Sequence, residues 1–197
     1  MSENSRAIGF VFIPGFADWE YGMLSASAVD WFGDMAIAMS PDGKPVASMS
    51  GFALSPQRAA VVEESADLDG IVLVGSDRWA SDEAPDVSAL LHSLRGRGAI
   101  VGGICAGTLG LARAGLFADV AHTSNGRDWI LRHLPDYPGN DNYRDVPYAV
   151  ADAGIVSAPG SAPGTFALEF LTLLHPDKTE ELAGMRALFQ KEYAASS

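Results

Sequence analysis

Cys105 is the single cysteine of the 197-residue chain, and a thiol is a side chain that can do covalent chemistry. It lies in the stretch VGGICAGTLG, where apolar and small residues precede it and a segment with helical spacing follows. A helix N-terminus offers free N–H groups and a positive dipole end, which can lower a thiol pKa from about 8.5 to roughly 3.5–7.5. We therefore expect Cys105 to be a reactive thiol at a strand-to-helix corner, and the alternative is a buried thiol that only packs.

The residues beside Cys105 are small, as a tight corner requires. Gly103, Cys105 and Gly107 form the pattern G-x-C-x-G, which is the cysteine analogue of the serine nucleophile elbow. Gly102 and Ala106 meet the same demand for small side chains. The pattern predicts a cysteine nucleophile elbow at this point of the chain.

Acidic residues follow the first apolar run, in the stretch FIPGFADWEYG. This stretch places Asp18 and Glu20 in the first turn of a predicted helix, where carboxylates usually complement the helix dipole. We expect Asp18 to be the N-cap of that helix. A thiolate needs a polar neighbour, and Glu20 is a candidate for that neighbour.

Composition narrows the function classes. The net charge is -12 with 13 basic residues, which opposes binding to a phosphate backbone, so we expect no nucleic-acid partner. No apolar run approaches the roughly 20 residues of a membrane span. The four histidines are scattered without zinc-site spacing, so no metal site is expected. A lone cysteine and the polar start MSENSRA predict a cytoplasmic protein without a secretory signal.

Apolar runs bounded by turn residues alternate with segments of helical spacing. We predict strands at 8–13, 35–39, 71–74 and 99–104, two short ones around 152–154, and short strands or a hairpin within 46–62. Helices are predicted at 18–32, 86–94, 108–114, 165–174 and 178–193. This alternation favours one α/β domain over residues 1–197, with a mostly parallel sheet and helices on both faces. The strand ends at 14–15, 75–76 and 105–107 should then meet at one edge of the sheet.

Two of these motifs together carry a family resemblance. GICAGT after a buried strand and PGFADWE after the first strand resemble the ThiJ/PfpI superfamily, and the similarity runs from residue 8 to about residue 174. Glu20 lies five residues past Gly15, as in the family. The resemblance implies a flavodoxin-like α/β sandwich related to class I glutamine amidotransferases. It also implies that Cys105 is the nucleophile and that a protonated Glu20 donates a hydrogen bond to its sulfur.

The resemblance implies further parts of the site. The backbone N–H groups of Ser76 and Ala106 match the oxyanion-binding positions of the family, and Gly75 matches its small turn residue. Tryptophans and one asparagine are candidates for the mouth of the pocket, although plain packing is the alternative for each tryptophan. These pocket candidates are Asn125, Trp19, Trp79 and Trp129.

The chain departs from the family pattern at two positions. PfpI-type peptidases have a histidine directly after the cysteine, where this chain has Ala106. Many other members have one twenty residues after the cysteine, where this chain has Asn125. His122 could serve as a base only in a shifted register, and we expect it to be a structural histidine at a strand end. We expect His133 and His175 on the surface. The missing Cys–His pair argues against peptidase and amidase activity.

Three functions stay open at this point. The first is a cysteine-dependent, cofactor-free lyase or hydrolase that acts on a small carbonyl-type substrate, as hydratases, glyoxalases and deglycases of the superfamily do. The second is a redox-sensing or protective protein that works through oxidation of Cys105. The third is a PfpI-like peptidase or an amidotransferase-like hydrolase. The resemblance also implies a homodimer, and Glu180 and Glu181 are expected on a solvated helix face.

Overall fold

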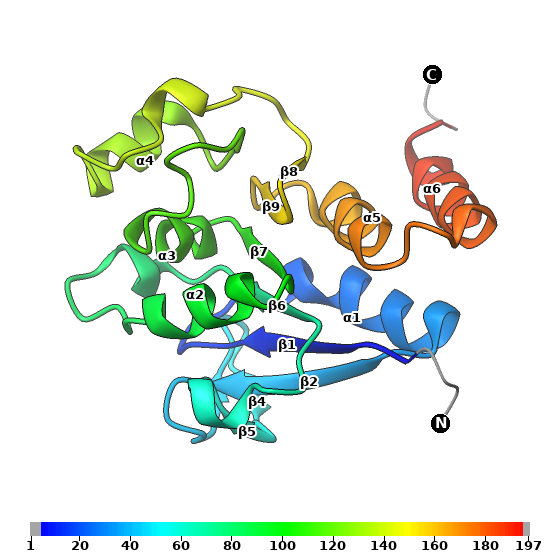
Figure 1. Ribbon diagram of the computed structural model, residues 1–197, viewed down its shortest axis with the longest axis horizontal. Helices are drawn as coiled ribbons and strands as arrows, with labels where there is room; N and C mark the ends of the chain where they lie inside the picture. Colours follow the sequence, from blue (N-terminus) through cyan, green and yellow to red (C-terminus); the bar gives the residue numbers. More distant parts are fainter. Residues whose placement is uncertain (1–4, 195–197) are drawn as a thin grey trace.

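A seven-stranded sheet forms the centre of the computed structural model, which describes residues 5–194 (Figure 1). The strand order is β5-β2-β1-β6-β7-β9-β8, and every neighbouring pair is parallel except β8 with β9. A separate antiparallel hairpin consists of β3 (Val46–Ala47) and β4 (Ala53–Leu54). The sheet strands are β1 (Ala7–Val11), β2 (Met35–Ser40), β5 (Arg58–Ala59), β6 (Gly70–Leu73), β7 (Ile100–Ile104), β8 (Val150–Asp152) and β9 (Ile155–Ala158).

Helices cover both faces of this sheet, as the sequence predicts. On one face α1 (Trp19–Phe32), α5 (Pro163–Leu174) and α6 (Thr179–Ala194) share a core. On the other face α2 (Ser88–Gly96), α3 (Gly107–Arg113) and α4 (Arg127–His133) share a second core. Short 3-10 helices η1 (Val62–Glu64), η2 (Asp77–Ala80) and η3 (Asn140–Asn142) lie in the connections.

The central strands are buried on both faces, which explains their continuous apolar sequences. All five residues of β1 and all four of β6 are buried. Along β1, Ala7 and Val11 face the core shared with α2 and α3, whereas Ile8 and Phe10 face the core shared with α1 and α5. Alternate side chains along a strand therefore pack into two separate cores.

Most predicted elements are confirmed within a few residues, including the hairpin expected within 46–62. The helix α4 was not predicted. Its seven residues, RDWILRH, bury only Ile130 and have no side-chain cap, so the sequence lacks a strong helical pattern there. Within residues 5–194, none of the helices combines the length and the apolar composition that a membrane span requires.

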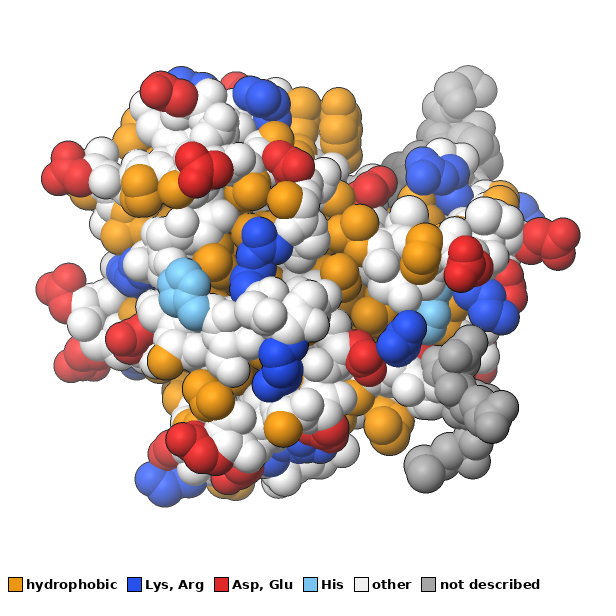
Figure 2. Space-filling model, in the orientation of Figure 1, with side chains coloured by type: hydrophobic (Ala, Val, Ile, Leu, Met, Phe, Trp, Pro, Cys, Tyr) orange, Lys and Arg blue, Asp and Glu red, His pale blue; other side chains and the backbone are white. Residues whose placement is uncertain are grey.

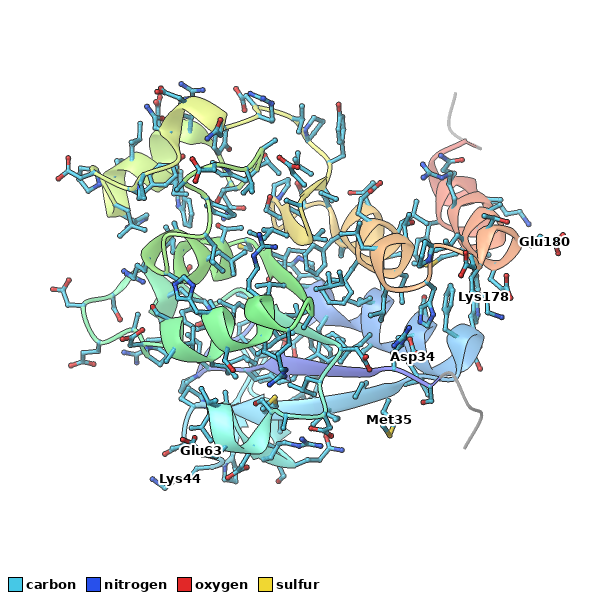
Figure 3. The ribbon with its side chains drawn as sticks, in the orientation of Figure 1. Asp34, Met35, Lys44, Glu63, Lys178 and Glu180 are labelled. Atoms are coloured by element: carbon cyan, nitrogen blue, oxygen red, sulfur yellow. The ribbon has the colours of Figure 1, made fainter. Side chains whose placement is uncertain are left out.

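The end of the sheet that is opposite the strand ends at 14–15 and 105–107 holds a buried polar pair. His175 follows α5 and its Nε2 lies 2.7 Å from Asp34 Oδ2, just before β2; Asp34 is labelled in Figure 3. Asp34 Oδ1 accepts a hydrogen bond from the Arg6 N–H, and the His175 ring stacks on Phe32. The prediction that His175 lies on the surface is therefore wrong, because it pairs with a residue 141 positions away.

Surface charge agrees with the composition. Acidic side chains are spread over the face in Figure 2, with basic side chains between them. Glu180 is exposed near the start of α6, and Glu181 pairs with Lys178 at 3.1 Å. His133 is exposed, as predicted. This part of α6 is a solvated face, as the sequence predicts.

Candidate active site

Cys105 occupies the corner between β7 and α3, with a backbone φ of 56°. Such a positive φ is unfavourable for a residue with a side chain and persists only where the surroundings fix it. Here the Cys105 N–H donates to Ala158 O at 2.9 Å, and the Thr108 hydroxyl donates to Cys105 O at 2.6 Å. The corner holds the half-buried thiol at the carboxyl end of the sheet.

Glu20, in the first turn of α1, is fully buried beside this thiol. Its Oε2 accepts the Gly75 N–H at 2.8 Å, whereas Oε1 is buried and, among residues 5–194, has no partner other than the Cys105 thiol. A methyl group added at Gly160 would lie 2.9 Å from the Cys105 sulfur and 3.0 Å from Glu20 Oε1. The sulfur and Glu20 Oε1 therefore border the same small space.

Glycine is required at position 75 because two side chains meet there. A Cβ at Gly75 would overlap Glu20 Oε2 and would lie 2.7 Å from Cys105 Cβ. Gly75 follows β6, Glu20 follows β1 and Cys105 follows β7, and these three strands are neighbours in the sheet. The structure thus brings together three of the residues that the sequence singles out.

Burial raises the pKa of both acids in this pair. It raises the pKa of Glu20 to about 7. Burial also raises the pKa of Cys105 to about 11, and the Glu20 carboxylate adds to that rise. The prediction that the helix lowers the thiol pKa is therefore wrong, because the end of a seven-residue helix does not outweigh burial beside a carboxylate. Between pH of about 7 and about 11 the two groups hold one proton.

Asn125 hydrogen-bonds directly to the sulfur, whereas the sequence predicted only that it lines the mouth of the pocket. Its Nδ2 donates to Cys105 Sγ at 3.2 Å, and its Oδ1 accepts the Gly160 N–H at 3.0 Å. It lies twenty residues after the cysteine, where counting from Cys105 already identified it as a pocket candidate, and the structure adds its hydrogen bond to the sulfur. The side chain at this position therefore offers the thiol an amide donor and no base.

The predicted oxyanion positions lie beside the corner. The Ala106 N–H is hydrogen-bonded to the Cys105 sulfur, which partly offsets the rise in the thiol pKa. Ser76 is the N-cap of η2, where its hydroxyl donates to Pro14 O at 2.7 Å and accepts the Arg78 N–H. Within residues 5–194 the Ser76 N–H has no protein acceptor. The role of these two amides as oxyanion donors stays a prediction.

His122 has a structural environment and does not hydrogen-bond to the thiol. It is fully buried, stacks on Phe117 with ring centroids 4.0 Å apart, and its ring nitrogens contact Val120 O and the Tyr137 hydroxyl. Burial lowers its pKa. These contacts agree with the expectation of a structural histidine.

The three tryptophans that were candidates for the pocket mouth differ in burial and in contacts. Trp79 is fully buried and its Nε1 donates to Val74 O at 2.8 Å, so its predicted place at the pocket mouth is wrong. Trp129 packs edge-on against His133 within α4, so it too belongs to the packing. Trp19 is 54% exposed and its Nε1 donates to Gly160 O at 3.0 Å. Only Trp19 of these three is tied to the loop that borders the thiol.

Asp18 stands at the N-cap position of α1 but does not cap the helix. Its carboxylate instead accepts the Ser50 N–H at 3.2 Å and is bonded to the Ser48 side chain, which lowers its pKa. The predicted capping role is therefore wrong. Asp18 ties the β3–β4 hairpin to the start of α1.

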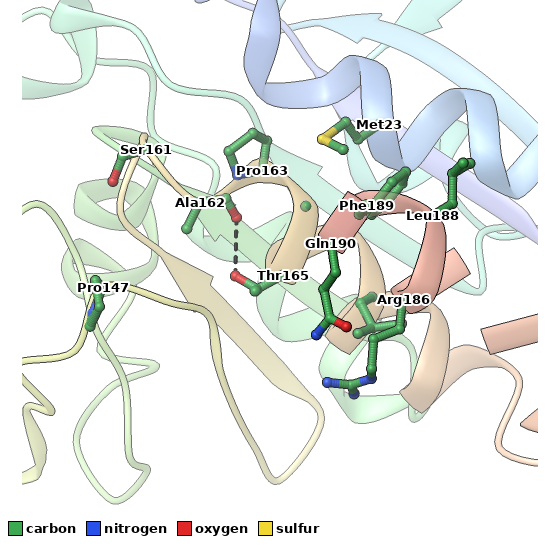
Figure 4. A pocket seen from close by; sticks show the side chains of 12 residues that line it. Met23, Pro147, Ser161, Ala162, Pro163, Thr165, Arg186, Leu188, Phe189 and Gln190 are labelled. Carbon is green, nitrogen blue, oxygen red and sulfur yellow. Dashed lines mark hydrogen bonds between the residues drawn. The ribbon is translucent and has the colours of Figure 1, made fainter. Parts of the chain in front are cut away.

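Two hollows lie next to the loop at 159–161. One of about 330 Å³ is lined by Asn125, Asp145, Pro147 and Ser161, among others. The second, of about 460 Å³, lies between α1, α5 and α6 and also reaches Pro147 and Ser161 (Figure 4). No group of three or more histidine, cysteine or acidic side chains among the described residues could hold a metal ion.

Comparison with known proteins places the chain in a family. The DJ-1/PfpI family matches residues 6–173. YoaZ of Bacillus subtilis (strain 168), an uncharacterized protease, is 30% identical over 165 residues, which cover 80% of this chain and 78% of that protein. The crystal structure of the DJ-1 superfamily protein Atu0886 from Agrobacterium tumefaciens shares 36% identity with a TM-score of 0.88, over 95% of this chain and 99% of that one. The flavodoxin-like sheet and this similarity agree, and the chain belongs to the DJ-1/PfpI family.

Proposed function

We propose that this protein is a cysteine-dependent, cofactor-free enzyme that acts on a small carbonyl-type electrophile, in the manner of a hydratase, glyoxalase or deglycase. The observation that supports this proposal is the pairing of Cys105 with a buried carboxyl oxygen, Glu20 Oε1, that has no other partner. Structural carboxylates in protein interiors are normally satisfied by hydrogen bonds. A buried carboxyl oxygen whose one partner is a thiol is suited to taking and giving a proton.

In the proposed reaction the proton that the pair shares moves from the Cys105 thiol to the Glu20 carboxylate, which leaves a Cys105 thiolate beside a protonated Glu20. As the bond between Sγ and the carbonyl carbon forms, the π electrons of the carbonyl move to its oxygen. The Ser76 and Ala106 N–H groups support this oxyanion, which then takes the proton from Glu20. The product is a neutral hemithioacetal beside a Glu20 carboxylate, and the carboxylate removes a proton when the adduct breaks down.

Peptide cleavage is the alternative that the names of relatives favour, because YoaZ is called a protease. A leaving amine needs a proton donor, which is a histidine in most cysteine hydrolases. The side chain at the sulfur is the Asn125 amide, which cannot transfer a proton at ordinary pH. His122 is occupied by Val120 and Tyr137. Carbonyl addition, in which Glu20 alone moves protons, therefore fits this site better.

Redox sensing through Cys105 has weaker support from the surroundings of the thiol than from its position in the sequence. Oxidation to sulfenic acid proceeds through the thiolate and follows thiolate character and exposure. Burial and the Glu20 carboxylate raise the pKa of Cys105 to about 11, and the thiol is only half-exposed. If oxidation were the function, mild peroxide would add about 32 Da stoichiometrically, since sulfinic acid carries two added oxygens.

Turnover assays on one panel of substrates separate these functions. Wild type, Cys105→Ser and Glu20→Gln would be incubated with methylglyoxal, isocyanides, simple amides and casein, with His133→Ala as an exposed-residue control. We expect turnover of a small electrophile that both site variants lose and the control retains. Cleavage of casein that depends on Cys105 would establish the peptidase instead. Small-molecule turnover that persists in Cys105→Ser would overturn the proposal.

We also propose that the protein forms a homodimer through the tip of the β3–β4 hairpin. Residues 46–57 contain no charged side chain, and Met49 and Phe52 are 55% and 72% exposed. Two copies with a net charge of -12 repel each other least where such an uncharged apolar surface is presented. Light scattering should give a dimer that Phe52→Asp converts to a monomer, whereas Tyr148→Asp, which alters another exposed aromatic, leaves the dimer intact. A monomeric wild type would contradict this.

A further inference from the structure

The amide of Asn125 has a defined orientation at the thiol. A backbone N–H can only donate, so the Gly160 N–H fixes Oδ1 as the atom that faces Gly160, at 3.0 Å. The other end of the amide, Nδ2, must then face Cys105 Sγ, at 3.2 Å. The sulfur is thereby presented with an N–H donor and cannot be presented with a carbonyl oxygen.

The loop that fixes this amide is itself held from the other side. Trp19 Nε1 donates to Gly160 O at 3.0 Å, so both backbone polar groups of Gly160 are hydrogen-bonded to side chains of the site. Trp19 directly precedes Glu20 in α1. One continuous chain of hydrogen bonds therefore joins the half-exposed indole, Gly160, Asn125 and the Cys105 sulfur.

The segment that carries Asn125 is anchored independently of the thiol. The Thr123 N–H donates to the Ser157 hydroxyl at 2.9 Å, and the Ser124 hydroxyl lies 2.7 Å from Thr108 Oγ1. Tyr143 also donates to Ser124 O. The backbone under Asn125 is fixed by these bonds, so its side chain needs no other role in holding the segment.

We propose that Asn125 is a catalytic residue that stabilises the thiolate form of Cys105 as a fixed N–H donor, and that Trp19 is a positioning residue that acts on it through Gly160. This inference rests on the proposed function, because it assigns the third group of the same centre. An amide donor at the sulfur favours the charged form without exchanging a proton. Glu20 thus remains the one group of the three that transfers a proton, and Asn125 determines how much of the pair's negative charge resides on sulfur.

The pH dependence of Cys105 alkylation tests this directly, because the chain contains a single cysteine and every alkylated protein reports on that thiol. Iodoacetamide labelling would be followed by intact-mass spectrometry across the pH range for wild type, Asn125→Ala, Asn125→Asp and Trp19→Phe. Trp31→Phe is the matched control, since Trp31 lies in the same helix without a hydrogen bond to the loop. Thermal unfolding of each variant checks that it is folded.

The alkylation rates of the variants should rank by how strongly each substitution alters the N–H donor at the Cys105 sulfur. Asn125→Ala should alkylate about fivefold more slowly below the thiol pKa, since a hydrogen bond of ordinary net strength is lost. Asn125→Asp, which places a carboxylate oxygen at the sulfur, should alkylate at least about tenfold more slowly. Trp19→Phe should show about a twofold decrease, and Trp31→Phe none. The midpoint of the alkylation profile should move to higher pH in the same order.

The outcomes also separate this inference from the proposed function. Folded Asn125 variants with the wild-type alkylation profile would overturn it, because a merely structural asparagine changes stability and leaves the thiol pKa unchanged. If Trp19→Phe and Trp31→Phe gave equal profiles, the positioning role of Trp19 would be wrong. A shifted profile in a protein that turns over no electrophile would contradict the proposed function and leave the assignment of Asn125 to the thiol intact.

Discussion

Two buried carboxyl groups lie at opposite ends of the sheet, and their surroundings differ in one respect. Asp34 has both oxygens occupied, Oδ1 by the Arg6 N–H and Oδ2 by His175 Nε2. Glu20 has one oxygen occupied by the Gly75 N–H, while the other faces the space beside Cys105. Both carboxyls are removed from water, so the difference lies in hydrogen bonding and not in exposure.

This difference distinguishes a structural carboxyl from a reactive one. A buried polar group that is fully bonded stabilises the fold and has no capacity left for a ligand. A buried group that is left partly unbonded lowers stability and persists where the site uses it. On this reasoning Asp34 joins α5 to the start of β2, and Glu20 serves the chemistry of Cys105. Substitutions at the two places should therefore have opposite effects.

The largest effect is expected at the structural pair. His175→Ala leaves Asp34 Oδ2 buried without its partner and removes the stacking on Phe32, which should lower the free energy of unfolding by about 3–5 kcal/mol. Chemical denaturation of this variant measures the loss. His133→Ala, at an exposed histidine, is the control and should be neutral. A loss of less than about 1 kcal/mol would show that the pair is not structural.

In contrast to His175→Ala, Glu20→Gln should increase the free energy of unfolding. Folding raises the pKa of Glu20 from 4.5 to about 7, so the folded state binds this proton more tightly, and stability falls as the pH rises through that window. Above pH of about 7 the wild type should therefore be about 3 kcal/mol less stable than the neutral Glu20→Gln variant. The two proteins should converge below pH 4.5, where the carboxyl is neutral in both states. Denaturation curves that differ equally at pH 4 and pH 8 would contradict this account.

The space between Glu20 and Cys105 can be filled without changing either residue. The methyl group of Gly160→Ala would lie 2.9 Å from the sulfur, at a backbone conformation that is not in the left-handed region. We expect alkylation and turnover to fall by about 100-fold, since an adduct needs this volume. Gly22→Ala, where a methyl group meets no atom within 4 Å, is the control. Unchanged alkylation of a folded Gly160→Ala would place the substrate elsewhere.

The smallest expected effect is on the pH profile of turnover. Reaction requires the Glu20–Cys105 pair to have lost one proton and kept the other, so kcat/KM should rise through a pH of about 7 and decline towards about 11. His122 is buried and bonded within its own cluster, so His122→Gln should not move these limits. A profile with a limit that disappears in His122→Gln would assign acid–base work to that histidine.

Local patterns in the sequence predicted the parts of the site that follow strands. Cys105 comes directly after a buried apolar run and Glu20 lies in the first turn of the helix that follows another, and parallel strands bring such positions to one edge. Partners that lie far apart in the chain leave no local pattern, which is why the pairing of Asp34 with His175 was missed. The thiol pKa was mispredicted for a related reason, since a helix start is visible in the sequence and the depth of burial is not.

The tryptophans show the same limit of prediction from sequence. Trp19 and Trp79 have similar local surroundings, each near a predicted strand end, yet one is half-exposed and the other fully buried. The difference arises because Trp79 points into the core shared by α2 and α3, where Val74 O accepts its indole N–H. The sequence shows which residues are apolar and how they are spaced. Only tertiary packing decides whether such a residue borders a site.

We propose that Glu20 and Cys105 act as one pair that shares a proton. Ultraviolet titration of the thiolate in wild type and in Glu20→Gln tests it most directly, since Cys105 is the only cysteine. Burial raises the thiol pKa in both proteins, but only the wild type has the added effect of the carboxylate. We predict that the thiol pKa falls from about 11 in the wild type to a lower value in Glu20→Gln that stays above 9. The same thiol pKa in both proteins would contradict the account.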